Sequence, residues 1–118
     1  MKKSVLVIST LDTKGQETLY LKDKLKTIGL APILMDISGR GSDIAGIDIH
    51  AARVAEAGGG AFEEMKSSRD RTRLTNIMMT GGSRLAANLG AEGKLDGVIA
   101  VSYTRLRAHE TVRWISFA

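Results

Sequence analysis

The polar segment Ser9–Glu17 combines the residue types that proteins use to bind phosphate groups. Thr10 and Thr13 supply hydroxyl donors, and Lys14 supplies a cation. The segment leads into a predicted helix, whose first backbone N–H groups lack partners and whose dipole presents its positive end to an anion. We therefore predict a phosphate-binding loop at Thr10–Glu17, and a nucleoside polyphosphate is a suitable ligand for it.

The local pattern leaves other interpretations open. The segment has neither the Gly-x-x-x-x-Gly-Lys-Ser/Thr sequence of P-loop proteins nor the Gly-x-Gly-x-x-Gly sequence of dinucleotide-binding proteins. In the alternative interpretation, Asp12 or Thr13 only caps the helix and Glu17 faces solvent. Asp36, which follows Gly15 by 21 residues, either accepts hydrogen bonds from a ribose or simply starts a turn.

Three aliphatic runs predict the strands that position this loop. Residues 4–8, 31–37 and 97–101 have the continuous apolar pattern of strands buried on both faces of a parallel sheet. Residues 16–28 have apolar positions at helical spacing, and Gly29 is expected to end that helix. The sequence thus predicts a Rossmann-like α/β fold, a three-layer arrangement with a short parallel sheet and helices between the strands. The loop lies at the edge where such sheets bind ligands.

Two more helices are expected between the second and third strands. Asp48 is positioned to cap the first, at residues 50–57, and a short turn around residues 62–65 follows it. The second is predicted for residues 69–92. Its internal pair Gly81-Gly82 indicates close packing against another element, because glycine in a helix is otherwise unfavourable by about 1 kcal/mol relative to alanine.

Composition and charge narrow the class of protein. The 118 residues are 43% apolar and 25% charged, as in one average globular domain. There is no cysteine, no apolar run long enough to span a bilayer and no secretory signal, so we expect a cytoplasmic protein without a membrane partner. Because the chain has only two histidines, no metal site is expected.

The arginines Arg69, Arg71 and Arg73 are expected to form a solvated helix surface, with Arg69 and Arg73 on one face. Since aromatic residues are few, no nucleic-acid partner is expected.

Residues 102–118 differ abruptly in composition from the rest of the chain. They contain the single tryptophan and one each of the two tyrosines, phenylalanines and histidines. The string that runs from Val101 to Thr111 resembles the translated sequencing-adapter read-through that ends many metagenome-derived reading frames. We therefore expect residues 1–101 to be native sequence and residues 102–118 to be a non-native tail. A genuine C-terminal helix or strand is the alternative.

The string Ser-Val-Leu-Val-Ile-Ser-Thr-Leu-Asp-Thr-Lys-Gly-Gln-Glu at residues 4–17 resembles the opening of the Tm-one-like ATP-binding domain family, a poorly characterised group of the UPF type. The strand ending in Asp36, the alanine-rich segment after Asp48 and residues 91–99 match the family in the same order. Members are similar to two Rossmann-like subdomains that bind ATP between them. The resemblance implies that residues 1–101 are the N-terminal part of such a domain and that ATP, with or without Mg²⁺, is the cofactor. The site residues it implies are Thr10, Leu11, Asp12, Thr13, Lys14, Gly15, Glu17 and Asp36.

The chain also departs from the family. Members usually have glycine at the position of Ser9 and glutamate at the position of Gln16, and they continue after the third strand with a glycine-rich phosphate loop that this chain lacks. We therefore expect an incomplete nucleotide site in an N-terminal fragment. Two other functions stay open: a piece of an ATP-dependent or hydrolytic enzyme, in which Asp12 or Glu17 positions Mg²⁺ or water, and a protein-interaction module stabilised by nucleotide. No catalytic residue is predicted, and the intact parent is expected to be a homo-oligomer.

Overall fold

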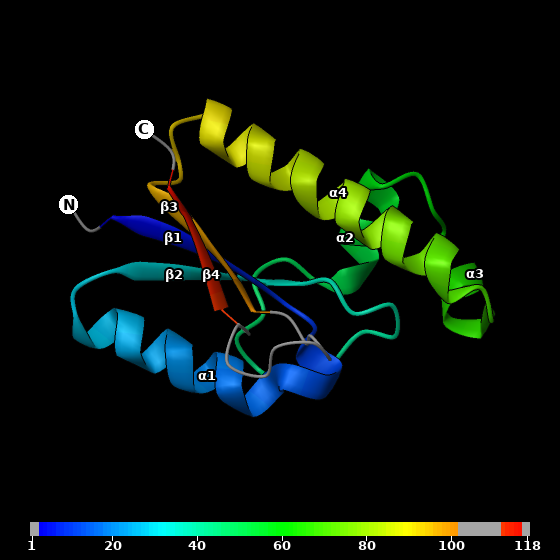
Figure 1. Ribbon diagram of the computed structural model, residues 1–118, viewed down its shortest axis with the longest axis horizontal. Helices are drawn as coiled ribbons and strands as arrows, with labels where there is room; N and C mark the ends of the chain where they lie inside the picture. The colour runs from blue at the N-terminus through cyan, green and yellow to red at the C-terminus, as the bar shows by residue number, and fades with distance from the viewer. Residues whose placement is uncertain (1–2, 102–111, 117–118) are drawn as a thin grey trace.

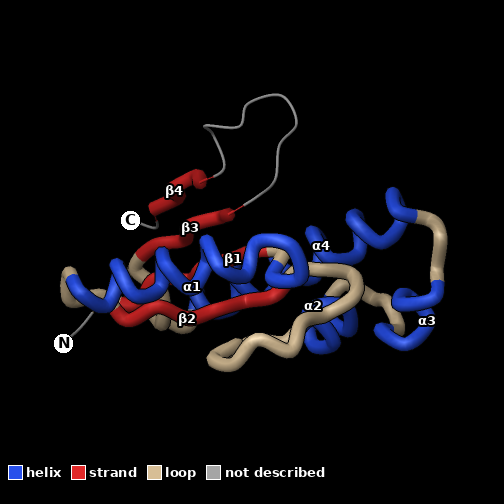
Figure 2. The backbone as a smooth tube through the Cα atoms, turned by 90° about the horizontal axis from the view of Figure 1, so that it is seen from below, coloured by secondary structure: helices blue, strands red, loops and turns tan. Residues whose placement is uncertain are grey.

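A central sheet separates the first helix of the chain from the three helices that follow the second strand. The computed structural model describes residues 3–101 and the backbone of the strand at 112–116. Helix α1 (Leu11–Thr27) lies on one face of the sheet, and α2 (Ala51–Ala57) and α4 (Arg71–Ala91) lie on the other (Figure 1). The short helix α3 (Phe62–Ser67) lies near the start of α4, and the view turned by 90° shows the same layers (Figure 2).

Three parallel strands form the sheet, with a fourth antiparallel strand at its edge. Their order is β2-β1-β3-β4, with bounds Ser4–Ser9 for β1, Ala31–Asp36 for β2, Gly97–Val101 for β3 and Val112–Ser116 for β4. Ser9 pairs with Asp36 on one side and with Val101 on the other, so the three parallel strands end together. The predicted α/β fold with a short parallel sheet is confirmed.

The aliphatic runs form buried strands because both faces of the sheet are covered by helices. Val5, Leu6 and Val7 of β1 are no more than 1% exposed. Leu6 packs into the core on the α2 and α4 side, whereas Val5 and Val7 pack into the core that α1 covers. At the end of α1, Gly29 adopts a φ of 89°, and the next N–H, that of Leu30, bonds the Leu25 carbonyl. The predicted stop at Gly29 is therefore confirmed.

The segment after β2 returns to that strand and lies parallel to its end, where Ile49 bridges Met35. The Asp48 carboxylate accepts the Leu34 N–H at 2.8 Å, and the Asp36 N–H bonds the Ile49 carbonyl. Helix α2 begins at Ala51, and His50 before it makes no side-chain capping bond. The prediction that Asp48 caps this helix is wrong, because its carboxylate is used by the neighbouring strand.

Helix α4 runs without interruption through Gly81-Gly82 and packs closely on α2. A Cβ atom at Gly81 would overlap the Val54 carbonyl oxygen and lie 2.9 Å from the Gly58 nitrogen. The predicted close packing is confirmed. The helix begins at Arg71, where Asp70 accepts the Arg73 N–H at 3.0 Å. Since Arg69 precedes the helix, the expectation that Arg69 and Arg73 share a helical face is wrong.

The C-terminal residues are described only in part. Residues 102–111, 117 and 118 lie outside the described ranges, while 112–116 form β4, which pairs with β3 from Val101↔Val112 to Gly97↔Ser116. That residues 102–118 are non-native stays a prediction. Within the described ranges, no helix combines the length and the apolar character needed to cross a membrane.

Candidate functional site

A groove of about 930 Å³ lies at the edge where β1 and β2 end. Two chain segments that follow these strands border it, and the region from α3 to the first turns of α4 closes the opposite side. Its volume falls within the range of about 300–1,000 Å³ that is usual for ligand pockets. The residues lining it are Thr10, Asp12, Thr13, Lys14, Ile37, Ser38, Gly39, Arg40, Met65, Lys66, Ser68, Arg69, Arg71, Leu74, Thr75, Met78 and Met79.

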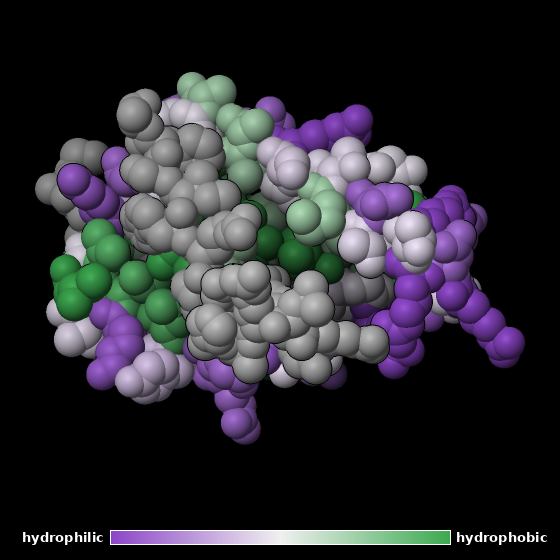
Figure 3. Space-filling view, viewed as in Figure 1, coloured by the Kyte–Doolittle hydropathy of each residue, from purple (hydrophilic) through white to green (hydrophobic). Residues whose placement is uncertain are grey.

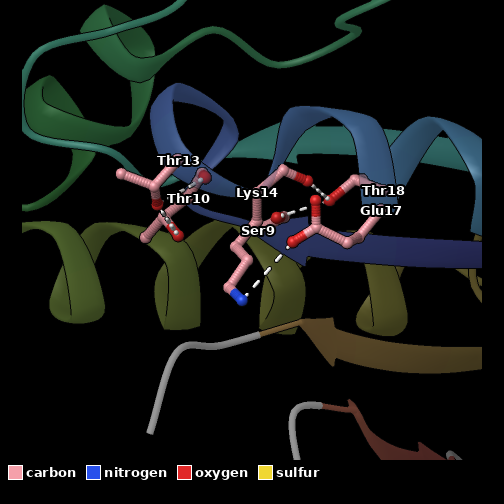
Figure 4. Close-up of polar contacts among 6 residues, drawn as sticks. All are labelled: Ser9, Thr10, Thr13, Lys14, Glu17 and Thr18. Carbon is pink, nitrogen blue, oxygen red and sulfur yellow. Dashed lines mark hydrogen bonds and ion pairs between the residues drawn. The ribbon is translucent and has the colours of Figure 1, made fainter. Parts of the chain in front are cut away.

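The residues that follow β1 form one side of the groove, which we call the loop wall: Thr10, Asp12, Thr13 and Lys14. Their side chains bond mainly to near neighbours. The Thr10 and Thr13 hydroxyl oxygens lie 3.2 Å apart, and the Lys14 ammonium lies 3.4 Å from the Glu17 carboxylate (Figure 4). Three of the four side chains of the loop wall thus contact residues of the same segment.

The loop wall is helical, in contrast to the predicted loop. Helix α1 begins at Leu11, five residues before the predicted start at Gln16, and bends at Lys14, where φ is −113° and ψ is 24°. The Thr18 hydroxyl donates to the Lys14 carbonyl at 2.7 Å and also lies 2.7 Å from the Ser9 hydroxyl (Figure 4). A threonine that bonds the carbonyl four residues earlier often bends a helix. The predicted phosphate loop is thus a first helical turn followed by a kink.

Asp36 lies beneath the loop wall and connects it to the segment after β2. Its side chain is 1% exposed, and its Oδ1 atom accepts the backbone N–H of Leu11 at 3.2 Å and that of Ser38 at 2.9 Å. The carboxylate thereby satisfies a helix-start N–H group and complements the positive end of the helix dipole. Asp36 does not line the groove, so the structure places it under the site.

The other predicted site residues lie away from the groove. Leu11 is 1% exposed and belongs to the core that α1 covers. Gly15 is buried, and a Cβ atom there would overlap the Ile44 side chain. Glu17 is exposed and contacts the groove only through its ion pair with Lys14. The groove therefore brings together Thr10, Asp12, Thr13 and Lys14, and leaves out the remaining four candidates.

Four cationic residues from three segments line the rest of the groove, which we call the basic wall: Arg40 in the segment after β2, and Lys66, Arg69 and Arg71 in the region from α3 to the start of α4. All four are exposed, and hydrophilic residues gather at the end of the molecule where α3 and the start of α4 lie (Figure 3). Among the described residues none of the four forms an ion pair; Lys66 lies 5.3 Å from the centre of the Phe62 ring. The sequence predicted a solvated surface for Arg69 and Arg71 and no role for Arg40 and Lys66. Only the fold brings them together.

The floor of the groove is apolar. Ile37, Met65, Leu74 and Met78 line it, and Met65 and Met78 are at most 4% exposed. A base or another flat apolar group can rest on such a surface, since ligand pockets combine apolar walls with a few polar groups. Within residues 3–101, no three histidine or acidic side chains gather into a possible metal site, and Asp12 is the one carboxylate that lines the groove.

Comparison with known proteins identifies the chain's relatives. Residues 3–104 match the family model described as the Uncharacterised protein family (UPF0261) N-terminal domain. The chain belongs to this family. It is 31% identical over 101 residues to a UPF0261 protein of Clostridium tetani, covering 86% of this chain and 25% of that protein. A UPF0261 protein of Brucella suis is 32% identical over 97 residues, covering 82% of this chain and 23% of the relative.

These relatives are much longer than the part that matches. The chain spans about a quarter of the curated UPF0261 proteins it resembles. No solved structure matches it. Membership of an uncharacterised family is confirmed, whereas the ATP binding implied by the resemblance to Tm-one-like proteins stays a prediction.

Proposed function

We propose that this UPF0261 N-terminal domain supplies the phosphate-binding side of an ATP site in the full-length protein. The observation that carries the proposal is the groove itself, which joins the predicted loop residues to the basic wall at the carboxyl edge of β1 and β2. Parallel α/β sheets bind their ligands at this edge. Among the residues that the structure describes, five cations and one carboxylate line the groove, so its charge suits a polyanion.

The phosphates and the base of ATP have chemically suitable neighbours in this arrangement. The Thr10 and Thr13 hydroxyls and the Lys14 ammonium face the phosphates, with the basic wall lining the rest of the groove. The apolar floor around Met65 and Met78 accommodates the adenine. Asp36 acts as a positioning residue, because its buried carboxylate fixes the backbone of the segments that follow β1 and β2 through Leu11 and Ser38.

Replacement of Lys14 tests the proposal. In the full-length protein, we expect Lys14→Ala to weaken ATP binding by about 1 kcal/mol, roughly fivefold, because a charge-assisted hydrogen bond is lost. The effect should lie at the low end of the range for such bonds, since Glu17 already pairs with Lys14. Isothermal titration calorimetry measures it, with Lys26→Ala as a control that removes an exposed lysine from the far end of α1.

The outcome also separates the three functions considered from the sequence. Absence of ATP binding by the wild-type protein would refute the proposed nucleotide site. Binding without turnover favours a binding domain or an interaction module, and turnover that depends on Asp12 favours an ATP-dependent enzyme. Turnover by the full-length protein is therefore measured alongside calorimetry.

A further inference from the structure

One buried hydroxyl in the groove has no partner. Ser38 is 3% exposed, and its Oγ atom makes no hydrogen bond to any part of the chain that the structure describes. Its backbone N–H is bonded to Asp36, so the residue is held in place by its main chain. Buried hydroxyl groups without partners are uncommon and unfavourable, because the group has lost its hydrogen bonds to water. A ligand that accepts a hydrogen bond from Ser38 removes this penalty.

We propose that Ser38 Oγ donates a hydrogen bond to a phosphate oxygen, and that the site takes ligands with two or more adjacent phosphoryl groups. This inference rests on the proposed function and deepens it. The loop wall follows β1, whereas Ser38 and Arg40 follow the neighbouring strand β2. A chain of phosphates contacts the segments after both strands at once.

The distribution of backbone donors supports a role for side chains. The Leu11 N–H at the start of α1 is already bonded to Asp36, and the N–H groups of Thr13 and Lys14 are bonded to the Thr10 carbonyl. These groups are therefore not available to an anion as the first N–H groups of a helix usually are. Hydroxyl groups and cations therefore take a larger share of the recognition, and Ser38 is the buried hydroxyl among the described residues that lacks a partner.

Charge favours more than one phosphoryl group. A phosphate monoester carries only about −1.5 to −2 charges at pH 7. The groove is lined by five cations, of which the four in the basic wall form no ion pair among the described residues. A diphosphate or triphosphate neutralises more of this charge than orthophosphate does. Affinity should therefore rise with the number of phosphoryl groups.

The test uses the full-length protein and inorganic tripolyphosphate. We expect wild-type protein to bind tripolyphosphate at least tenfold more tightly than orthophosphate by calorimetry, and Ser38→Ala to weaken tripolyphosphate and ATP binding about tenfold or more. The melting temperature of ligand-free Ser38→Ala should be equal to or above that of wild type, because no hydrogen bond is lost. Ser42→Ala is the matched control, since its hydroxyl lies in the same segment but already accepts the Ile44 N–H at 3.2 Å.

Several results would overturn the inference. Unchanged tripolyphosphate affinity in Ser38→Ala removes the proposed contact, and a lowered melting temperature shows that the hydroxyl is structural. Orthophosphate binding as tightly as tripolyphosphate removes the preference for adjacent phosphoryl groups. If wild-type protein binds tripolyphosphate with the expected Ser38 dependence but does not bind ATP, the inference stands and the proposed function fails. If it binds ATP without dependence on Ser38, the reverse holds.

Discussion

The two walls of the groove differ in how their polar groups are satisfied. In the loop wall, Thr10 pairs with Thr13 and Lys14 pairs with Glu17. In the basic wall, the guanidinium groups of Arg40, Arg69 and Arg71 form no ion pair with a described residue. Side chains of the loop wall are thus paired before any ligand arrives, whereas the exposed cations of the basic wall form no ion pair with a described residue.

This difference suggests that the two walls contribute differently to ligand binding. Preorganised donors lose little conformational entropy on binding and determine where a ligand sits. Clustered exposed cations act over longer distances, raise the rate at which an anion arrives, and are screened by salt. The loop wall is therefore expected to set the geometry of binding, and the basic wall to set its salt dependence.

The largest expected effect comes from removing Asp36, which joins the segment that carries the loop wall to the segment that leads to Arg40 of the basic wall. Asp36→Ala leaves the N–H groups of Leu11 and Ser38 without their acceptor in a buried place. We expect the free energy of unfolding to fall by about 3 kcal/mol, because two hydrogen bonds to a charged acceptor are lost. A guanidinium titration of the 118-residue chain measures this. Asp36→Asn should lose less, because the amide oxygen still accepts a hydrogen bond. Reduced ATP affinity in Asp36→Asn with unchanged stability would instead support a ribose contact.

A smaller effect is expected from shifting α4, the helix that carries Arg71 of the basic wall. Gly81→Ala places a Cβ atom against the Val54 carbonyl oxygen and the Gly58 nitrogen, and these backbone atoms cannot move aside cheaply. We expect α4 to shift from α2 and stability to fall by about 2 kcal/mol, the usual cost of overpacking. Gly82→Ala is the matched control. Its Cβ would lie 3.4 Å from Ile37 and 3.6 Å from Met35, which both side chains can accommodate. Equal losses in the two variants would refute the close contact at Gly81.

Truncation of the basic wall should lower the affinity for the ligand more than it lowers the stability of the fold. Arg69→Ala combined with Arg71→Ala is expected to lower tripolyphosphate affinity about tenfold at low salt, with a flatter dependence on salt concentration than in wild type. Calorimetry across a series of salt concentrations measures both quantities. Arg73→Ala removes an exposed arginine from the same helix end, but this residue lies outside the groove. If Arg73→Ala had the same effect, net charge and not the wall would explain the result.

Local patterns in the sequence predicted the three parallel strands and the segment that forms the loop wall, but not β4. Val5, Leu6 and Val7 form a continuous aliphatic run because helices cover both faces of their strand, and that requirement is visible in the residues themselves. Gly81 was also informative, since glycine within a helix needs a packing reason.

Long-range contacts explain what the sequence did not predict. Helix α1 starts at Leu11 because Asp36, 25 residues later, accepts its N–H. Asp48 satisfies Leu34 across the turn and so cannot act as a cap. The basic wall collects Arg40 and Arg69, which are far apart in the chain, and no local pattern distinguishes such residues from solvated charges.

The smallest expected effect concerns the ion pair within the loop wall. Glu17 and Lys14 side chains are 55% and 18% exposed, and exposed ion pairs contribute only about 0.2–1 kcal/mol. We therefore expect Glu17→Gln to change the free energy of unfolding by no more than about 0.5 kcal/mol. Binding of tripolyphosphate without Mg²⁺ should become about twofold tighter, because Lys14 no longer interacts with a competing carboxylate.

The matched control for this change is Glu56→Gln, which removes one negative charge from an exposed position on α2. If both variants bind tripolyphosphate more tightly to the same extent, the higher affinity results from the change in net charge. If only Glu17→Gln binds it more tightly, the higher affinity results from the release of Lys14 from its ion pair. Repeating the titration with ATP and Mg²⁺ adds a second test of the loop wall. Weaker binding by Glu17→Gln only when Mg²⁺ is present would mean that this carboxylate contacts the metal, and the loop wall would then act on the cation as well as on the phosphates.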